Sequence, residues 1–300
     1  MSLLVVGSTA FDTVETPHGT AKQCLGGSST YFGLAARLFT DVQLVSVVGE
    51  DFPDAHRRTF TDAGIDLAGL ETKPGKTFAW HGRYSADMNS RETVDVQLNT
   101  FGDFKPKVPA SYRETPFVFL ANGAPATQAS VLDQMAAPRF AVADTMDLWI
   151  EHNREELLAL LPRLDGLILN DEEVKMLTGK SNLIQAGRAA LKIGPKLVIV
   201  KKGEHGCFLF STFFHYALPA YPTEHVVDPT GAGDSFAGGF MGYLAGSASI
   251  SVWNLKRAVA YGTVAASLTV EGFGVDRIAA AERTTIERRY HELQQFVASS

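Results

Sequence analysis

The chain has 300 residues, of which 45% are hydrophobic and 20% charged, and its formal net charge is −6. This charge supplies no basic footprint for nucleic acid, and the apolar run at residues 3–6 is too short for a membrane span or a signal peptide. Cys24 and Cys207 lie far apart, form no metal-ligand pattern and suit a reducing cytoplasm.

Short apolar runs alternate with longer helical patterns along the chain. The runs are continuous rather than alternating in polarity, as is typical of strands buried on both faces of a parallel sheet. They cover residues 3–6, 42–47, 117–120, 140–143, 166–169 and 197–200. Helical patterns cover residues 29–39, 126–135, 151–161 and 183–192. This order predicts a single three-layer α/β/α domain over residues 1–300, with a mostly parallel central sheet.

Ligands bind such sheets at the carboxyl ends of the strands, where Asp12, Asn122, Asp144 and Asn170 are expected. Asp12 comes just after the first strand, and Gly26 and Gly27 come just before the first helix. Taken alone, neither feature demands a ligand: Asp12 is also explained as an ordinary turn residue, and the glycine pair as a tight turn.

Residues 72–104 break the alternation of strands and helices. An extended run from Phe78 to Tyr84 is followed by a polar turn, and residues 93–99 then alternate in polarity. Two extended runs around a turn predict a small antiparallel sheet inserted into the larger domain. Asp95, Gln97 and Asn99 would share one face of the second run, which either contacts a polyhydroxyl substrate or is a solvated face opposite the apolar residues.

Two later segments follow predicted strands. Asn170-Asp-Glu-Glu173 opens a helix, and the simplest reading is an Asn170 N-cap with Glu173 completing a capping box. Lys201-Lys-Gly-Glu-His-Gly206 follows the strand at 197–200, and its adjacent lysines are equally consistent with surface charge.

The most informative segment is Asp228-Pro-Thr-Gly-Ala-Gly-Asp234, which opens an apolar helix. Gly231, Ala232 and Gly233 let a ligand approach the unpaired N–H groups of the helix start, where the helix dipole also favours an anion. Asp234 beside a phosphate is electrostatically awkward unless it accepts a proton from a hydroxyl during phosphoryl transfer. The alternative is an ordinary Asp-initiated helix packed through Gly238 and Gly239.

Competing motifs are absent. Gly75-Lys-Thr and Gly179-Lys-Ser lack the first glycine of a P-loop, and Phe236 occupies the third glycine position of a dinucleotide fingerprint. The eight histidines show no zinc-helix spacing, and no Gly-x-Ser-x-Gly turn is present.

Taken together and in this order, these segments resemble the ribokinase/PfkB family of sugar and nucleoside kinases. The 228–234 segment resembles the family's Asp-Thr-x-Gly-Ala-Gly-Asp signature, with Pro229 in place of Thr. Gly26-Gly27 resembles the N-terminal di-glycine signature, and Asn170-Asp-Glu-Glu173 resembles the Asn-x-x-Glu motif.

The resemblance implies an ATP- and magnesium-dependent kinase with Asp234 as the general base and an anion hole at residues 231–234. It implies substrate contacts at Asp12, Gly26 and Gly27, a β lid over the substrate that also serves some members as a dimer clasp, and Glu173 organising Mg²⁺ through water. Nucleotide-side contacts are expected at Asn170, Lys202, Gly203 and Thr230, and a monovalent cation such as K⁺ beside Asp228 and Thr230.

The substrate is a sugar, a cyclic polyol or a nucleoside. Tyr31 stands where ribokinase-like members usually have Asn, and Ala10 replaces another polar residue, which argues against ribose itself. Tyr31, Phe78 and Trp80 could stack on a nucleobase, although core packing explains any one of them. The expected substrate contacts are Asp12, Gly26, Gly27, Tyr31, Asn99 and Asn122. The alternative of another class, a sensor without catalysis, would be expected to have lost the base or the anion-hole glycines, and both are present.

Overall fold

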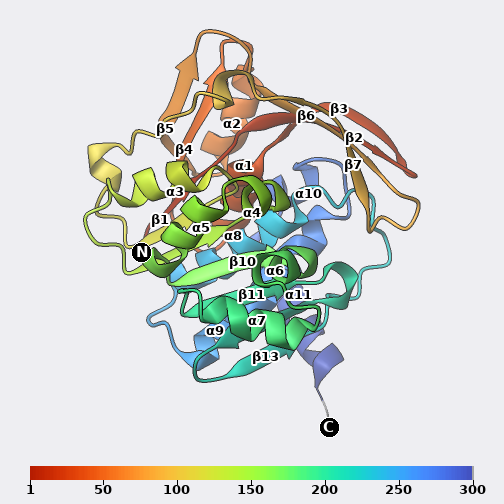
Figure 1. Cartoon of the computed structure of the whole chain (residues 1–300). Helices are drawn as coiled ribbons and strands as arrows, with labels where there is room; N and C mark the ends of the chain where they lie inside the picture. Colours follow the sequence, from red (N-terminus) through yellow and green to blue (C-terminus); the bar gives the residue numbers. More distant parts are fainter. Residues whose placement is uncertain (299–300) are drawn as a thin grey trace.

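The computed structural model describes residues 1–298 and contains a large central sheet with helices on both faces (Figure 1). The sheet has nine strands in the order β13-β12-β11-β10-β9-β8-β1-β4-β5. Only β12 runs against its neighbours. The expected α/β/α fold with a mostly parallel sheet is therefore confirmed.

The strands of the large sheet include all six predicted runs, most of them extended by one or two residues. Their bounds are β1 (Leu3–Val6), β4 (Val42–Gly49), β5 (Asp66–Lys73), β8 (Phe117–Leu120), β9 (Phe140–Asp144), β10 (Gly166–Asn170), β11 (Leu197–Lys201), β12 (Cys207–Ser211) and β13 (His215–Leu218).

Eleven α-helices occur within residues 1–298, together with four short 3₁₀-helices. The pattern at 151–161 forms two helices because the backbone leaves the helical region at Asn153. The bounds are α1 (Ser28–Ala36), α2 (Asp54–Asp62), α3 (Pro125–Leu132), α4 (Asp147–His152), α5 (Arg154–Leu160), α6 (Asp171–Thr178), α7 (Leu183–Leu191), α8 (Ala232–Gly246), α9 (Val252–Thr269), α10 (Asp276–Ala279), α11 (Arg283–Val297), η1 (Asn99–Phe101), η2 (Ala110–Tyr112), η3 (Leu161–Arg163) and η4 (Gly203–His205).

The core has one half on each side of the sheet, and β1 shows why its strands are apolar without alternation. Leu3 and Val5 pack into one half with α1, α8 and α9, whereas Leu4 and Val6 pack into the other half with α3, α5 and α6. None of the four side chains is more than 5% exposed. Successive side chains of a strand point to opposite faces, so burial of both faces requires a continuous apolar run.

A second sheet, called the lid sheet here, has four strands in the order β3-β2-β6-β7. Figure 1 shows it curving away from the large sheet. Its strands are β2 (Ala10–Thr16), β3 (Gly19–Gly26), β6 (Phe78–Tyr84) and β7 (Arg91–Gln97). The segment at 72–104 therefore provides β6 and β7, and an unpredicted hairpin at 10–26 provides the other half.

The predicted polar face of the second lid run is partly wrong. Gln97 donates a hydrogen bond to Asp95, so these two side chains do lie together. Asn99, however, lies beyond the end of β7, because the chain turns into η1 with a positive φ at Asn99. Its amide donates to the Thr77 carbonyl oxygen at 2.9 Å.

None of the helices between residues 1 and 298 combines the length and the apolar character that a bilayer crossing needs.

Candidate active site

The turn before α8 has the geometry of an anion hole. Gly231 has φ +74°, in the left-handed region, and α8 begins at the next residue with Asp234 in its first turn. A Cβ at Gly231 would lie 2.3 Å from the Tyr31 ring, so both the conformation and the space require glycine. The Tyr31 side chain is fully buried against this turn. Tyr31, which the sequence analysis predicts as a substrate contact, thus supports from within the core the turn at residues 228–234, called the signature turn here.

Glycines farther along α8 set the helix close to its neighbours. A Cβ at Gly238 would lie 2.3 Å from the Phe32 carbonyl oxygen on α1, and one at Gly239 would lie 2.8 Å from the Tyr261 carbonyl oxygen on α9. The packing explanation for these glycines is therefore correct. It coexists with the anion hole, because close packing on both sides holds the start of α8 in place.

Lys201 is the basic residue that the fold brings to this helix start. Its ammonium nitrogen lies 2.6 Å from where a Cβ of Gly233 would be, so the absence of a side chain at position 233 leaves room for the cation. Lys202 lies elsewhere, with its ammonium 5.0 Å from the centre of the Phe208 ring, and Gly203 begins the exposed helix η4. Lys201 is a site residue that the sequence analysis missed.

Asp234 has the properties of a general base. Burial raises the pKa of its carboxyl group to about 6, against the opposing effect of Lys201 and Arg91. The side chain nevertheless keeps some exposure to solvent. A carboxylate with a pKa nearer neutrality is a stronger base than an ordinary aspartate and is still ionised at pH 7.

Asp12 lies at the inner end of β2, against the di-glycine turn. A Cβ at Gly26 would lie 1.9 Å from an Asp12 carboxylate oxygen, and Gly27 has φ +95°. Burial raises the pKa of Asp12 to about 7, partly offset by a hydrogen bond from the Gly27 N–H, and Asp228 and Asp234 raise it further. The three residues predicted as substrate contacts are thus in contact with one another, beside the predicted base.

We expect Asp12→Asn to stabilise the protein at pH 8. The pKa of Asp12 is about 7 in the folded state, against 3.8 for an aspartate in the unfolded chain, so the stability that its protonation confers is full below pH 3.8 and lost as pH rises through 7. Asparagine removes a buried charge above pH 7, which should raise the free energy of unfolding by on the order of 2 kcal/mol. Denaturant unfolding at pH 5 and pH 8 tests this, with the exposed Asp95→Asn as the control. Equal gains at both pH values would contradict it.

Asn170 and Glu173 form a full capping box at the start of α6. Asn170 Oδ1 accepts from the Glu173 N–H at 2.8 Å, and Glu173 Oε2 accepts from the Asn170 N–H at 2.6 Å. The structural explanation of this motif is therefore realised. Lys201 also lowers the pKa of Glu173 against the effect of burial, so the same carboxylate faces the centre of the site.

Asp144 joins the same group of charges from the end of β9. Its side chain is 6% exposed, and its Oδ1 atom has no hydrogen-bond partner within the described chain. Burial, Asp234 and Glu173 raise its pKa, and Lys201 opposes them. An unpartnered buried carboxylate oxygen is suited to a cation or an ordered water.

Asp228 and Thr230 close the other side of the signature turn. Asp228 is fully buried, and its carboxylate accepts hydrogen bonds from the Thr230 N–H at 2.9 Å and the Gly274 N–H at 3.2 Å. The Thr230 hydroxyl donates to the Tyr84 hydroxyl of the lid sheet at 3.2 Å.

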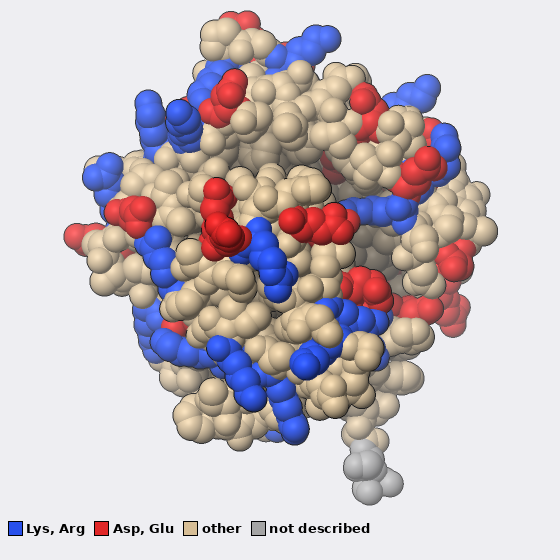
Figure 2. Space-filling view, viewed as in Figure 1, with Lys and Arg blue, Asp and Glu red and all other residues tan. Residues whose placement is uncertain are grey.

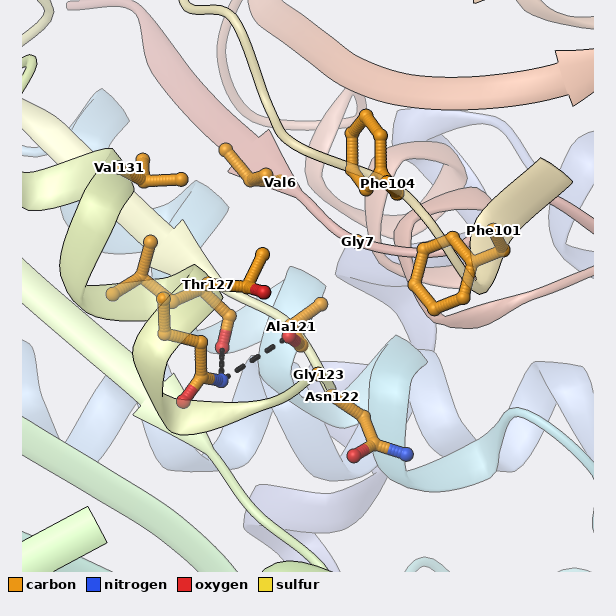
Figure 3. Close-up of a pocket in the computed structure, with 11 residues that line it drawn as sticks. Val6, Gly7, Phe101, Phe104, Ala121, Asn122, Gly123, Thr127 and Val131 are labelled. Atoms are coloured by element: carbon orange, nitrogen blue, oxygen red, sulfur yellow. Dashed lines mark hydrogen bonds between the residues drawn. The ribbon is translucent and has the colours of Figure 1, made fainter. Parts of the chain in front are cut away.

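Asn122 lies at the edge of a small apolar cavity of about 20 Å³. Figure 3 shows Phe101 and Phe104 on one side of the cavity and the Asn122 amide turned away from them. The amide is held by Trp149, which donates to it at 2.8 Å. A cavity of this size holds about one water molecule and is therefore too small to be the substrate pocket.

The charges of the site fit a magnesium–nucleotide complex. The site contains five carboxyl groups, and Lys201 or Arg91 acts on all of them except that of Asp228; the five belong to Asp12, Asp144, Glu173, Asp228 and Asp234. Figure 2 shows charged side chains of both signs along the hollow beneath the lid sheet. Polyphosphate beside so many carboxylates needs a divalent cation, and Mg²⁺ binds through one or two carboxylates, phosphates and water.

Comparisons with known proteins agree with this geometry. The profile of the "pfkB family carbohydrate kinase" matches residues 2–281. A cytidine kinase from Thermococcus kodakarensis is 29% identical over 253 residues, which cover 82% of this chain and 90% of that protein.

Two solved structures have the same fold. The nucleoside kinase of Methanocaldococcus jannaschii superposes with a TM-score of 0.79 at 19% identity, covering 97% of this chain and 98% of that one. A ribokinase II from E. coli in complex with ATP and Mg²⁺ gives 0.79 at 20% identity, with coverage of 97% and 99%. The signature turn, the paired Asp12 and Asp234 and the matching profile lead to one conclusion: the chain belongs to the pfkB family of carbohydrate kinases, and it is a phosphotransferase.

Proposed function

We propose that this kinase transfers the γ-phosphoryl group of Mg²⁺-bound ATP to a hydroxyl of a sugar ring, and that its acceptor is a nucleoside. The observation that carries the phosphoryl transfer is the juxtaposition of Asp234, Lys201 and the start of α8. The N–H groups of Gly233 and Asp234 have no backbone partner among residues 1–298, whereas the Ala232 N–H donates to the Pro229 oxygen at 3.1 Å. Asp234 accepts the proton of the attacking hydroxyl, and Lys201 with the amides of residues 233 and 234 stabilises charge on the transferring group. Asp12 orients the acceptor hydroxyls beside the base.

Magnesium-bound ATP would supply the phosphoryl group and neutralise its charge as transfer proceeds. Glu173, through water, and the unpartnered Asp144 oxygen are the side chains that fit the metal. Thr230, Asn170 and Gly203 border the nucleotide side. The proposal also assigns a monovalent cation to Asp228, which is fully buried and forms no ion pair among residues 1–298.

The lid sheet favours a nucleoside over a free sugar. Trp80 pairs with Asp12 in the β2–β6 register, so the indole and the carboxylate share the inner face of the lid sheet. Gly82 leaves room for the ring to lie along the strand, since a Cβ there would be 2.0 Å from it. Phe78 is occupied by stacking on Phe101, with 5.5 Å between ring centres. The cytidine and nucleoside kinases among the relatives support the same acceptor class.

A dimer through the lid sheet is the remaining part of the proposal. The edge strand β7 is exposed along its length, and Val94, Val96 and Leu98 are 42–51% exposed. Light scattering after size exclusion measures the mass, and Val96→Lys should leave a monomer.

We also propose a cytoplasmic location for the protein. The two cysteines, Cys24 and Cys207, are free thiols, which suits a reducing compartment.

We expect a coupled ADP-release assay with Mg²⁺ and ATP to give higher kcat/KM for cytidine, uridine or adenosine than for ribose, fructose or inositol. Removing the indole in Trp80→Ala should raise the KM for the nucleoside about tenfold or more, because base–aromatic stacking is worth about 1–3 kcal/mol. Trp253→Ala is the matched control, since Trp253 is exposed on α9. A free sugar as the preferred substrate, unaffected by Trp80→Ala, would overturn the nucleoside assignment.

A further inference from the structure

The tip of the β6–β7 hairpin touches the body of the protein at two points that border the active site. Tyr84, the last residue of β6, accepts the hydrogen bond from Thr230 of the signature turn. Asn89, in the turn between the strands, donates to the Glu204 carboxylate of η4 at 3.2 Å. The hairpin tip therefore lies across the site and contacts Thr230 on one side and Glu204 of η4 on the other.

Arg91 is placed on the inner face of this hairpin. It is the register partner of Tyr84, so the two side chains share the face that meets Thr230. Its guanidinium carbon lies 5.7 Å from the centre of the Trp80 ring, also on that face. The other arginine of the hairpin, Arg83, lies on the opposite face and pairs with Glu15 and Glu92.

The charge of Arg91 acts on carboxylates from three separate elements. Burial raises the pKa of Asp12 on β2, of Glu173 in the first turn of α6 and of Asp234 in the first turn of α8, and Arg91 opposes that rise in each. The contacts of Tyr84 with Thr230 and of Arg91 with Trp80 hold the guanidinium on the side of the hairpin that faces these carboxylates. Yet Arg91 is exposed and forms no ion pair within residues 1–298, so the structure uses its charge for no internal contact of that kind.

We propose that Arg91 is a catalytic residue, carried by the lid, whose guanidinium contacts the phosphoryl group as it moves from ATP to the acceptor. This inference rests on the proposed function. The acceptor oxygen forms a bond to the γ-phosphorus, the bond from that phosphorus to the bridging oxygen breaks, the bond's electron pair leaves with ADP, and the acceptor proton goes to Asp234. Arg91 neither gains nor loses a proton. Its planar donors match the phosphoryl oxygens, and its charge offsets the charge that spreads over them.

This placement links catalysis to lid position. Lys201 comes from the last residue of β11 in the large sheet, whereas the position of Arg91 depends on the contacts of the hairpin tip with Thr230 and Glu204.

The test compares Arg91→Ala with Arg91→Lys and with the matched control Arg83→Ala, on the same hairpin but its opposite face. With the acceptor found by the ADP-release assay, Arg91→Ala should lower kcat about 100-fold, below the range for arginine fingers supplied in trans, because Lys201 shares the charge. The KM for the acceptor should change less than threefold, lysine should recover part of the rate, and Arg83→Ala should stay near wild type. A raised KM with unchanged kcat, or equal losses in Arg91→Ala and Arg83→Ala, would overturn the proposal.

Calorimetry of ADP with Mg²⁺, alone and with aluminium fluoride, supplies a readout besides turnover. The wild type and Arg91→Ala should bind ADP alone alike, whereas only the wild type and Arg83→Ala should bind more tightly with the fluoride that mimics the phosphoryl group. Tightening that survives in Arg91→Ala would overturn the proposal even if no acceptor is found. Failure of the wild type to bind ADP at all would instead show that the proposed function is wrong, and with it this inference.

Discussion

Asp234→Asn is expected to lower kcat about 1000-fold, within the range for loss of a positioned general base, while nucleotide affinity changes only a few-fold. Asparagine keeps the size and polarity of the side chain, and the start of α8 does not depend on its charge, because Gly231 sets the turn. What is lost is the acceptor for the hydroxyl proton. The measurement is the ADP-release assay beside calorimetry of ADP binding.

The pH profile makes this test specific. The pKa of Asp234 is about 6, and the base acts in its ionised form, so wild-type kcat/KM should fall about tenfold for each pH unit below 6. Asp234→Asn should lose this acid limb. Asp171→Asn on the outside of α6, where Asp171 pairs with Lys175, is the control and should behave as wild type. Full activity in Asp234→Asn would exclude Asp234 as the base, and nucleotide binding without turnover in the wild type would favour a sensor.

The sequence predicts the large sheet well because its strands carry an unambiguous signal. Strands buried on both faces must be apolar throughout, and Gly or Asn follows most of them within a few residues, so six strands could be located within two residues. The signature at 228–234 is equally informative, because the crowding at Gly231 and the closeness of Lys201 to Gly233 demand small residues.

The lid hairpin at 10–26 could not be predicted in the same way. β2 is buried only at alternate positions, and β3 is buried only at its last two residues, so neither forms the continuous apolar run that identifies a core strand. Asp12 therefore looks like a turn residue from the sequence, although it lies within β2. Which lid arginine faces the site depends on the register of β6 and β7, which includes a bulge after His81.

The choice between Lys201 and Lys202 shows how one position along a strand decides a role. Lys201 is the last residue of β11 and the register partner of Asn170, so it stays in the sheet at the edge where the site forms. Lys202 has already left the strand and turns to Phe208. The sequence does contain a feature that distinguishes the two lysines, because Lys201 directly follows the buried run 197–200 and Lys202 does not.

Lys201→Met is expected to lower kcat about 100-fold or more, of the size seen when one preorganised donor of an anion hole is lost. Burial raises the pKa of Asp144, Glu173 and Asp234, and Lys201 opposes that rise in all three. Its removal should therefore raise the pKa of the base and move the acid limb of kcat/KM to higher pH, an effect that a mere loss of nucleotide affinity would not produce.

The adjacent Lys202→Met gives the matched control, because it removes the same side chain one residue away and leaves the carboxylates with their cation. We expect it to change kcat less than threefold and to leave the pH profile in place, whereas Lys201→Arg should keep the profile and part of the rate. Comparable losses in Lys201→Met and Lys202→Met would contradict the assignment. Since residues 1–298 supply Lys201 from the sheet and Arg91 from the lid beside five carboxyl groups, the rate should depend on each cation separately.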